Sequence, residues 1–266
     1  MPLVCVCSPK GGVGKTTVSA NLAYALARSG SKVLVIDFDV QNALRLHFGV
    51  PISDTRGYVE QATTVMDWSQ FILKADANVF VLPYGEAEEE QRLAFENAIS
   101  HDPHFLQRGL STVLNYPGLV VIADFPPGPV PALKAVQSFA DLHIVMMLAD
   151  TASLSLLPQI ENHKFLGAPL NQRLGEYYVV NQSDMRRNLS RDVSHFFEQR
   201  LGDKLLGMIH RDECVPEANA SQRSIIEFRP VSAAAFDIEL ISKKVAAIVG
   251  VKVGDGEMYA MPNPGI

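Results

Sequence analysis

A glycine-rich segment near the N-terminus, residues 8–17, reads Ser-Pro-Lys-Gly-Gly-Val-Gly-Lys-Thr-Thr. It follows a short β-branched run and precedes a stretch with helical periodicity, which is the strand–loop–helix setting of a phosphate-binding loop. The backbone N–H groups of such a loop turn toward an anion, and the helix N-terminus adds partial positive charge. We expect Lys15 to reach the β- and γ-phosphates of a nucleotide and the Thr16 hydroxyl to bind Mg²⁺. The candidate phosphate-binding residues are Lys10, Gly11, Gly12, Val13, Gly14, Lys15, Thr16 and Thr17.

Acidic residues stand at the ends of two other apolar runs. Asp37 ends the run 33–37 and is followed by Phe38 and Asp39, and Asp124 ends the run 119–124. In an extended chain Asp37 and Asp39 point to the same side. Carboxylates beside a triphosphate suit contacts to metal-bound water and the orientation of an attacking water. We therefore expect these acids to lie near the glycine-rich loop.

The apolar runs that carry these residues alternate with helical stretches. Most runs are continuously apolar, which is typical of strands covered on both faces. The alternation predicts an α/β fold with a doubly wound, mostly parallel sheet, whose strands end at one ligand-binding edge. Strands are predicted over residues 3–7, 33–37, 79–82, 119–124, 142–148, 177–181 and 205–209. Helices are predicted over residues 16–28, 88–107, 154–165, 184–200 and 232–249.

The sequence predicts one domain over residues 1–250 and an irregular tail over 251–266. Residues 51–76 give no clear pattern. The chain has 266 residues, of which 47% are hydrophobic and 20% charged, a composition that excludes a disordered protein. The net charge of −6 disfavours a dedicated nucleic-acid-binding protein. Three cysteines and the lack of an apolar run near 18 residues long indicate a cytoplasmic protein without direct membrane insertion.

The loop resembles that of the deviant-P-loop ATPases, the ParA/MinD family. All fixed positions of the pattern Lys-Gly-Gly-x-Gly-Lys-Thr-Thr are present from Lys10 onward, and Pro9 replaces the first glycine of the strict P-loop motif. The resemblance implies a SIMIBI-type P-loop NTPase fold, ATP and Mg²⁺ as cofactors, and slow hydrolysis of ATP to ADP and phosphate. It also implies a homodimer with ATP sandwiched at the interface, in which Lys10 touches the partner's phosphates.

The same resemblance assigns roles beyond the loop. Asp39 would orient the attacking water, and Asp37, Asp124 and Thr16 would hold the Mg²⁺ shell. The run after Asp124, Phe-Pro-Pro-Gly, resembles the second switch of the family, so the N–H of Gly128 would approach the γ-phosphate. These assignments make Lys10, Lys15 and Asp39 the candidate catalytic residues.

The base-binding end is expected after the strand over 177–181. By resemblance Asn181 would bind the adenine, and Arg211 stands at the turn that would close over the base. The family usually has proline where this chain has His210. Residues 181–184, Asn-Gln-Ser-Asp, also have the outline of a guanine-reading motif, but Gln182 replaces its lysine, so adenine is favoured.

Short segments outside the loop resemble the ParA-like ATPases found with bacterial cellulose synthase, the BcsQ (YhjQ) group. They lie at residues 42–48, 67–68, 82–85 and 209–213, and ATP binding requires none of them. This resemblance implies a spatial or assembly switch for the cellulose synthesis and secretion machinery. A protein partner of the cellulose synthase complex would recruit it to the inner membrane or cell pole.

A second interpretation is a ParA-type chromosome or plasmid partition ATPase, whose ATP dimer binds nonspecific DNA. Arg186, Arg187 and Arg191 fall in the helix predicted over 184–200, where they could contact phosphates. A solvated helix face or a site for a protein partner is the favoured interpretation of the same arginines. Binding of DNA would weaken steeply with salt, which separates the two interpretations.

Overall fold

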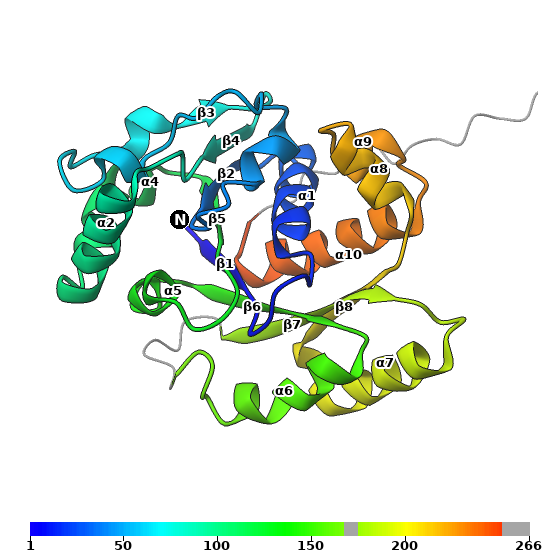
Figure 1. Ribbon diagram of the computed structural model, residues 1–266. Helices are drawn as coiled ribbons and strands as arrows, with labels where there is room; N and C mark the ends of the chain where they lie inside the picture. Colours follow the sequence, from blue (N-terminus) through cyan, green and yellow to red (C-terminus); the bar gives the residue numbers. More distant parts are fainter. Residues whose placement is uncertain (168–174, 252–266) are drawn as a thin grey trace, which may run out of the picture.

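The computed structural model describes residues 1–167 and 175–251, and within these ranges it contains one eight-stranded sheet. The strand order is β3-β4-β2-β5-β1-β6-β7-β8, and all neighbouring pairs are parallel except β3 with β4 (Figure 1). The predicted α/β fold is therefore confirmed. The strands are β1 (Leu3–Cys7), β2 (Lys32–Asp37), β3 (Leu73–Lys74), β4 (Val79–Leu82), β5 (Leu119–Asp124), β6 (Leu142–Leu148), β7 (Glu176–Ser183) and β8 (Leu205–His210).

Helices cover both faces of the sheet. In Figure 1, α1 and α10 lie on one side, and α5, α6 and α7 lie on the other. The helices are α1 (Lys15–Arg28), α2 (Glu89–His101), α3 (Phe105–Gly109), α4 (Ser111–Leu114), α5 (Pro131–Val136), α6 (Thr151–Glu161), α7 (Asn188–Leu201), α8 (Cys214–Ala220), α9 (Ile225–Phe228) and α10 (Ala233–Ile248). Short 3-10 turns occur at η1 (Leu44–Phe48), η2 (Val59–Gln61), η3 (Trp68–Phe71) and η4 (Gly202–Lys204).

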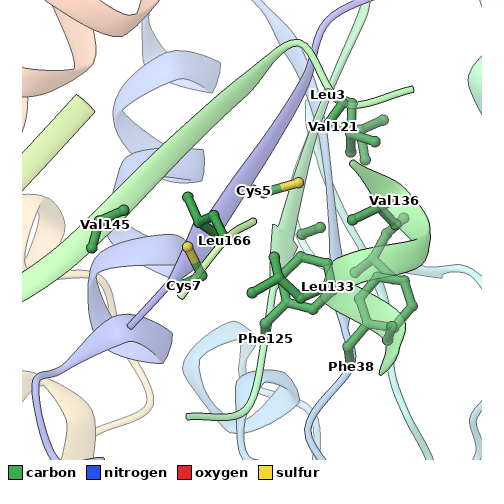
Figure 2. Close-up of a cluster of buried hydrophobic side chains, with 14 of the residues drawn as sticks. Leu3, Cys5, Cys7, Phe38, Val121, Phe125, Leu133, Val136, Val145 and Leu166 are labelled. Atoms are coloured by element: carbon green, nitrogen blue, oxygen red, sulfur yellow. The ribbon is translucent and has the colours of Figure 1, made fainter. Parts of the chain in front are cut away.

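Side chains of each central strand are divided between two hydrophobic cores. From β1, Cys5 and Cys7 enter the core beneath α5 and α6, whereas Val4 and Val6 enter the core beneath α1 and α10. Figure 2 shows the first core, where the two thiols lie among aliphatic and aromatic side chains. Burial raises the pKa of both thiols well above the ordinary value. Both faces of β1 are thus shielded from solvent, which explains its continuously apolar sequence.

Three predicted helices have different bounds. The helix predicted over 88–107 stops at His101, because Asp102 adopts an extended conformation and accepts the N–H of His104. The helix predicted over 154–165 spans 151–161 instead. It begins earlier because the Asp150 carboxylate accepts the N–H of Ser153 at 2.7 Å and caps the first turn.

The third difference concerns the arginines. The helix predicted over 184–200 begins only at Asn188, because residues 184–187 form a turn closed by the N–H of Arg187 and the carbonyl of Asp184 at 3.0 Å. Arg186 therefore precedes α7 and Arg187 caps it, so the prediction of three arginines on one helix was wrong.

Residues 51–76, for which the sequence shows no clear pattern, form the 3-10 turns η2 and η3 and the antiparallel edge strand β3. The tail predicted over 251–266 lies outside the described residues after Val251. No helix in the described part of the chain is both long enough and apolar enough to cross a membrane.

The strand order places the expected site where the connections between strands switch from one side of β1 to the other. β1 lies between β5 and β6, and the chain winds toward β4 on one side and toward β8 on the other. Ligands of open α/β sheets bind at the carboxyl ends of strands at such a point. Asp37 at the end of β2 is paired in register with Asp124 at the end of β5.

Candidate nucleotide-binding site

The loop between β1 and α1 is held by contacts to a neighbouring strand. Gly14 has φ 84°, a left-handed conformation, and a Cβ atom there would lie 2.4 Å from Nδ2 of Asn181. That amide nitrogen donates a hydrogen bond to the carbonyl of Val13 at 2.8 Å. Asn181 therefore braces the loop, and glycine is required at position 14.

The first turn of α1 points two hydroxyls at one carboxylate. Thr16 Oγ1 donates to Asp124 Oδ2 at 2.7 Å, and Ser19 Oγ donates to Asp124 Oδ1 at 2.9 Å. Lys15, the residue expected at the phosphates, is 6% exposed. Burial lowers its pKa, and the nearby charges of Asp124 and Asp39 partly offset that effect. The structure thus brings the loop lysine and the loop threonine together with the expected acids, since Asp37 lies beside Asp124 and accepts the N–H of Asp39.

The acids themselves are closely held. Burial raises the pKa of Asp124 to about 6, although its hydroxyl partners and Lys15 act in the opposite direction. Asp37 Oδ1 accepts the N–H of Asp39 at 2.9 Å, and its Oδ2 accepts the N–H of Leu44 at 3.2 Å. Burial, together with the charge of Asp124, raises the pKa of Asp37 well above its usual value. A cation bound beside Asp37 and Asp124 would stabilise the charged form of both carboxylates.

The donor set suits Mg²⁺ held mainly by a nucleotide. Within residues 1–167 and 175–251, no group of three or more histidine, cysteine or acidic side chains is placed to hold a metal alone. Mg²⁺ prefers oxygen ligands, keeps several waters and usually takes only one or two protein groups beside phosphates. The Thr16 hydroxyl and the carboxylates of Asp124 and Asp37 provide oxygens of that type.

Two expected phosphate contacts are occupied by the protein itself. Lys10 Nζ lies 2.7 Å from Asp150 Oδ2, so the lysine turns toward its own chain. The N–H of Gly128 donates to the carbonyl of Ser8 at 2.9 Å. The single N–H of Gly128 would have to leave Ser8 to reach a phosphate, whereas the Lys10 ammonium has two further hydrogens. Both phosphate contacts remain predictions.

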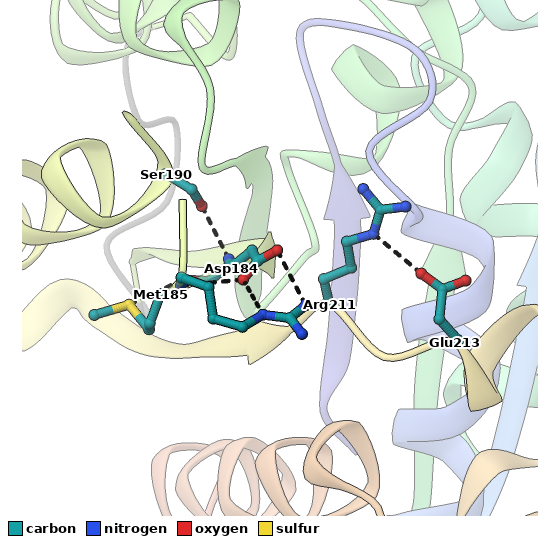
Figure 3. A network of polar contacts seen from close by, with 7 residues as sticks. Asp184, Met185, Ser190, Arg211 and Glu213 are labelled. Carbon is teal, nitrogen blue, oxygen red and sulfur yellow. Dashed lines mark hydrogen bonds and ion pairs between the residues drawn. The ribbon is translucent and has the colours of Figure 1, made fainter. Parts of the chain in front are cut away.

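A cavity of about 270 Å³ lies at the base-binding end, between the start of α1 and the turn after β8. Arg211 lines it, and its Nε is 3.3 Å from Glu213 Oε1 (Figure 3). Asn181 lines it as well, with Oδ1 accepting the N–H of Gln182 at 2.9 Å. Each amide end of Asn181 retains one unused hydrogen-bonding position, so a base contact by Asn181 stays a prediction.

Two of the arginines near α7 have surface partners and remain exposed. Arg186 Nε binds Asp184 Oδ1 at 2.9 Å, in the network that Figure 3 shows around Asp184. Arg191 lies 3.7 Å from Asp192 and also contacts Asn188. The sequence reasoning also missed two residues of the site, Ser19 and Asp150. Ser19 follows Thr16 by one helical turn, and Asp150 closely follows the end of an apolar strand, as Asp39 does.

The strand order, the loop and the acids together define a P-loop nucleotide-binding protein of the ParA/MinD type. The septum site-determining protein MinD of Pyrococcus horikoshii OT3, solved in complex with Mg-ADP, has a TM-score of 0.71 and 22% identity, covering 94% of this chain and 98% of that one. A plasmid partition protein from Borrelia burgdorferi has a TM-score of 0.65 and 21% identity, covering 92% and 98%. These likenesses establish the fold.

The chain belongs to the family described as "Cellulose biosynthesis protein BcsQ", whose sequence profile matches residues 1–245. The cellulose biosynthesis protein BcsQ of Salmonella typhimurium LT2 is 28% identical over 232 residues, which cover 86% of this chain and 88% of that protein. The subgroup predicted from the short segments outside the loop is thus confirmed. Membership in this family and the ParA/MinD fold support a P-loop ATPase.

Proposed function

We propose that this chain binds Mg·ATP, dimerises face to face around the nucleotide, and acts as a spatial or assembly switch for bacterial cellulose synthesis and secretion. One observation carries the ATPase part of the proposal. Lys15, Thr16, Asp37 and Asp124 meet at the carboxyl ends of β1, β2 and β5, beside a glycine-rich loop that opens a helix. The cellulose part rests on the name of the family.

The chemistry assigned to these residues is electrostatic. Lys15 stabilises negative charge on the β- and γ-phosphates. The Thr16 hydroxyl and the carboxylates of Asp37 and Asp124 would hold Mg²⁺, directly or through water, beside the nucleotide. Mg²⁺ would there supply positive charge that stabilises the phosphates. Asp39, which is close enough to Lys15 to affect the pKa of the lysine, orients the attacking water.

Dimerisation supplies the remaining contacts to the phosphates. Lys10 leaves Asp150 and reaches the phosphates of the partner's nucleotide, so the dimer forms only with ATP. The N–H of Gly128 leaves Ser8 and contacts the γ-phosphate, and Asn181 and Arg211 contact the base. Hydrolysis is slow, as expected when a P-loop site awaits an activating partner. In the cell, the switch is cytoplasmic and a protein of the cellulose synthase complex recruits it to the inner membrane or cell pole.

The test uses the Asp39→Ala chain, which should bind Mg·ATP without hydrolysing it and accumulate as a dimer. Sedimentation with and without Mg·ATP measures the dimer. The Lys10→Ala chain is the matched control and should bind ATP but stay monomeric. Native hydrolysis by Asp39→Ala, or an ATP dimer of Lys10→Ala, would contradict the roles assigned here.

A partition ATPase is the alternative that the same sample can test. The Asp39→Ala dimer is titrated against unrelated duplex DNA at about 150 mM salt and followed by anisotropy. ATP-dependent binding that fades with added salt would support the partition function and direct mutagenesis to Arg187 and Arg191. A confirmed dimer that does not bind DNA would support a protein client.

A further inference from the structure

The cavity at the base-binding end has one histidine in its wall, His210, the last residue of β8. Its neighbours in the wall include the loop glycine Gly14 and the α1 residue Thr17, so the cavity opens beside the phosphate-binding loop. A nucleotide held by its phosphates at that loop would direct its base into this cavity. His210 is therefore placed to contact a base.

Within the described residues, several other polar side chains of the wall have partners, although Asn219 Oδ1 and one position at each amide end of Asn181 do not. Asn181 braces the loop, and Arg211 pairs with Glu213. The Asp212 carboxylate accepts the N–H of Cys214 at 2.9 Å and that of Ala234 at 3.3 Å. The Nε2 atom of His210 also has no recorded hydrogen bond among the described residues. The imidazole thus offers the cavity a ring nitrogen.

Asp237 of α10 holds the imidazole in one orientation. Its Oδ2 atom accepts the backbone N–H of His210 at 2.8 Å and lies 2.8 Å from the ring Nδ1. The Asp237 side chain is 11% exposed and that of His210 is 49% exposed, so the anchor is buried while the imidazole stays accessible. A neutral imidazole carries one N–H. The carboxylate accepts it at Nδ1, which leaves Nε2 as a hydrogen-bond acceptor.

We infer that His210 recognises the base of the bound nucleotide, with Nε2 accepting a hydrogen bond from the exocyclic amine of a 6-aminopurine. The inference rests on the proposed binding of ATP and adds a specificity-determining residue to that site. A 6-oxopurine would place a carbonyl oxygen against the same lone pair, so the contact also discriminates against it. Asp237 acts as a positioning residue, because it sets which ring nitrogen carries the proton.

The test compares three nucleotides that differ at position 6 of the purine, of which only the 6-oxo form also carries a hydrogen on N1. ATP carries an amine, purine riboside triphosphate carries hydrogen and inosine triphosphate carries oxygen. Affinities are measured by competition with a fluorescent ATP analogue. The unsubstituted chain should bind ATP about three- to tenfold more tightly than purine riboside triphosphate, the range of one net hydrogen bond. Inosine triphosphate should bind more weakly still.

The His210→Phe variant should bring the ratio of the ATP and purine riboside triphosphate affinities close to one. Because the ratio is compared within one variant, a general loss of affinity does not affect it. Asp237→Ala should reduce the ratio as well, whereas Asp237→Asn retains an oxygen acceptor and should preserve most of it. His101→Phe, at an exposed position on α2, is the matched control and should leave the ratio unchanged.

Two results would overturn the inference while leaving the proposed function intact. The first is normal ATP binding with an unchanged ratio in His210→Phe. The second is tighter binding of inosine triphosphate than of ATP by the unsubstituted chain, which would make the ring a donor. A chain that binds none of the three nucleotides would overturn both the inference and the proposed function.

Discussion

Lys10 and Asp150 form an ion pair within one chain, with 2.7 Å between Nζ and Oδ2. The pair joins the loop after β1 to the start of α6, where Asp150 also caps the helix. Burial acts to raise the pKa of Asp150, but the hydrogen bonds from Lys10 and Ser153 outweigh it and lower that pKa. The lysine proposed to cross to a partner is therefore held by its own protomer, and this contact competes with the proposed crossing.

Releasing Lys10 should favour the dimer. Asp150→Asn retains an oxygen that can cap α6 but removes the charge that holds the lysine. Partly exposed ion pairs contribute about 1 kcal/mol or less, and the symmetric dimer contains two of them, so we expect the dimer of the Asp39→Ala, Asp150→Asn chain to tighten up to about 30-fold with Mg·ATP. Analytical ultracentrifugation measures the dissociation constant. Asp150→Ala, which also removes the cap, should in addition lower helix stability by about 1 kcal/mol. A weaker dimer in Asp150→Asn would show that Asp150 itself contributes to the interface.

Removing the buried loop lysine should abolish nucleotide binding. Lys15→Ala deletes the cation nearest to the expected β- and γ-phosphates, and we expect a loss of ATP affinity of at least about 100-fold. Titration of a fluorescent ATP analogue measures it. Lys32→Ala, at an exposed position on β2, is the control and should bind as the unsubstituted chain does. Normal affinity of Lys15→Ala would contradict the assignment of residues 8–17 as a phosphate-binding loop.

Acid should destabilise the fold through His143 on β6. Burial lowers the pKa of His143 to about 4, and its Nε2 is buried without a partner in the described residues. An unfolded histidine titrates near 6.5, so the unfolded chain binds this proton first. The stabilisation is complete above about pH 6.5 and is lost as the pH falls toward 4.

The size of this effect can be isolated by substitution. Between about pH 8 and pH 5, we expect His143 to lower the free energy of unfolding by about 2 kcal/mol. Urea unfolding of His143→Leu should show that much less pH dependence, and exposed His101→Leu should behave as the unsubstituted chain. Parallel pH profiles for His143→Leu and the unsubstituted chain would contradict the prediction.

Overpacking should destabilise the region around Trp68. A Cβ atom at Gly109, the last residue of α3, would lie 2.3 Å from Cε2 of the indole. We expect Gly109→Ala to lower the free energy of unfolding by about 1–3 kcal/mol, as measured by urea unfolding. Gln107→Ala, at an exposed position on the same helix, should have an effect within about 0.5 kcal/mol. Equal effects of the two substitutions would argue against tight packing at this contact.

The central strands could be predicted because each is a short continuous apolar run. Both faces of β1, β2 and β5 are buried, and their bounds differ from the prediction by at most one residue. β3 could not be predicted, because two residues at an antiparallel edge carry no periodicity. The first residues of the helices were predicted less accurately than the strands, since they depend on single capping contacts such as that between Asp150 and Ser153.

The expected site could be predicted as a set of residues but not as a set of bonds. The spacing of Lys15, Thr16 and Asp124 indicated that they meet, because parallel strands end at one edge of the sheet. Nothing in the spacing indicated that Asp124 is shared between Thr16 and Ser19. Contacts of this kind join residues more than 100 positions apart, and the three-dimensional fold alone brings them into reach.

The aromatic side chains behind the site form a continuous series toward the sheet edge. Trp68, the single tryptophan of the chain, is fully buried with its ring 4.8 Å from that of Tyr58. The Tyr58 hydroxyl donates to the carbonyl of Asp37 at 3.2 Å, and Phe38 stacks on Phe125 at 4.8 Å. A displacement of the Asp37 segment that moved Tyr58 would therefore alter the surroundings of one indole. The protein contains its own optical reporter, whose ultraviolet emission would follow such a displacement in real time without a label.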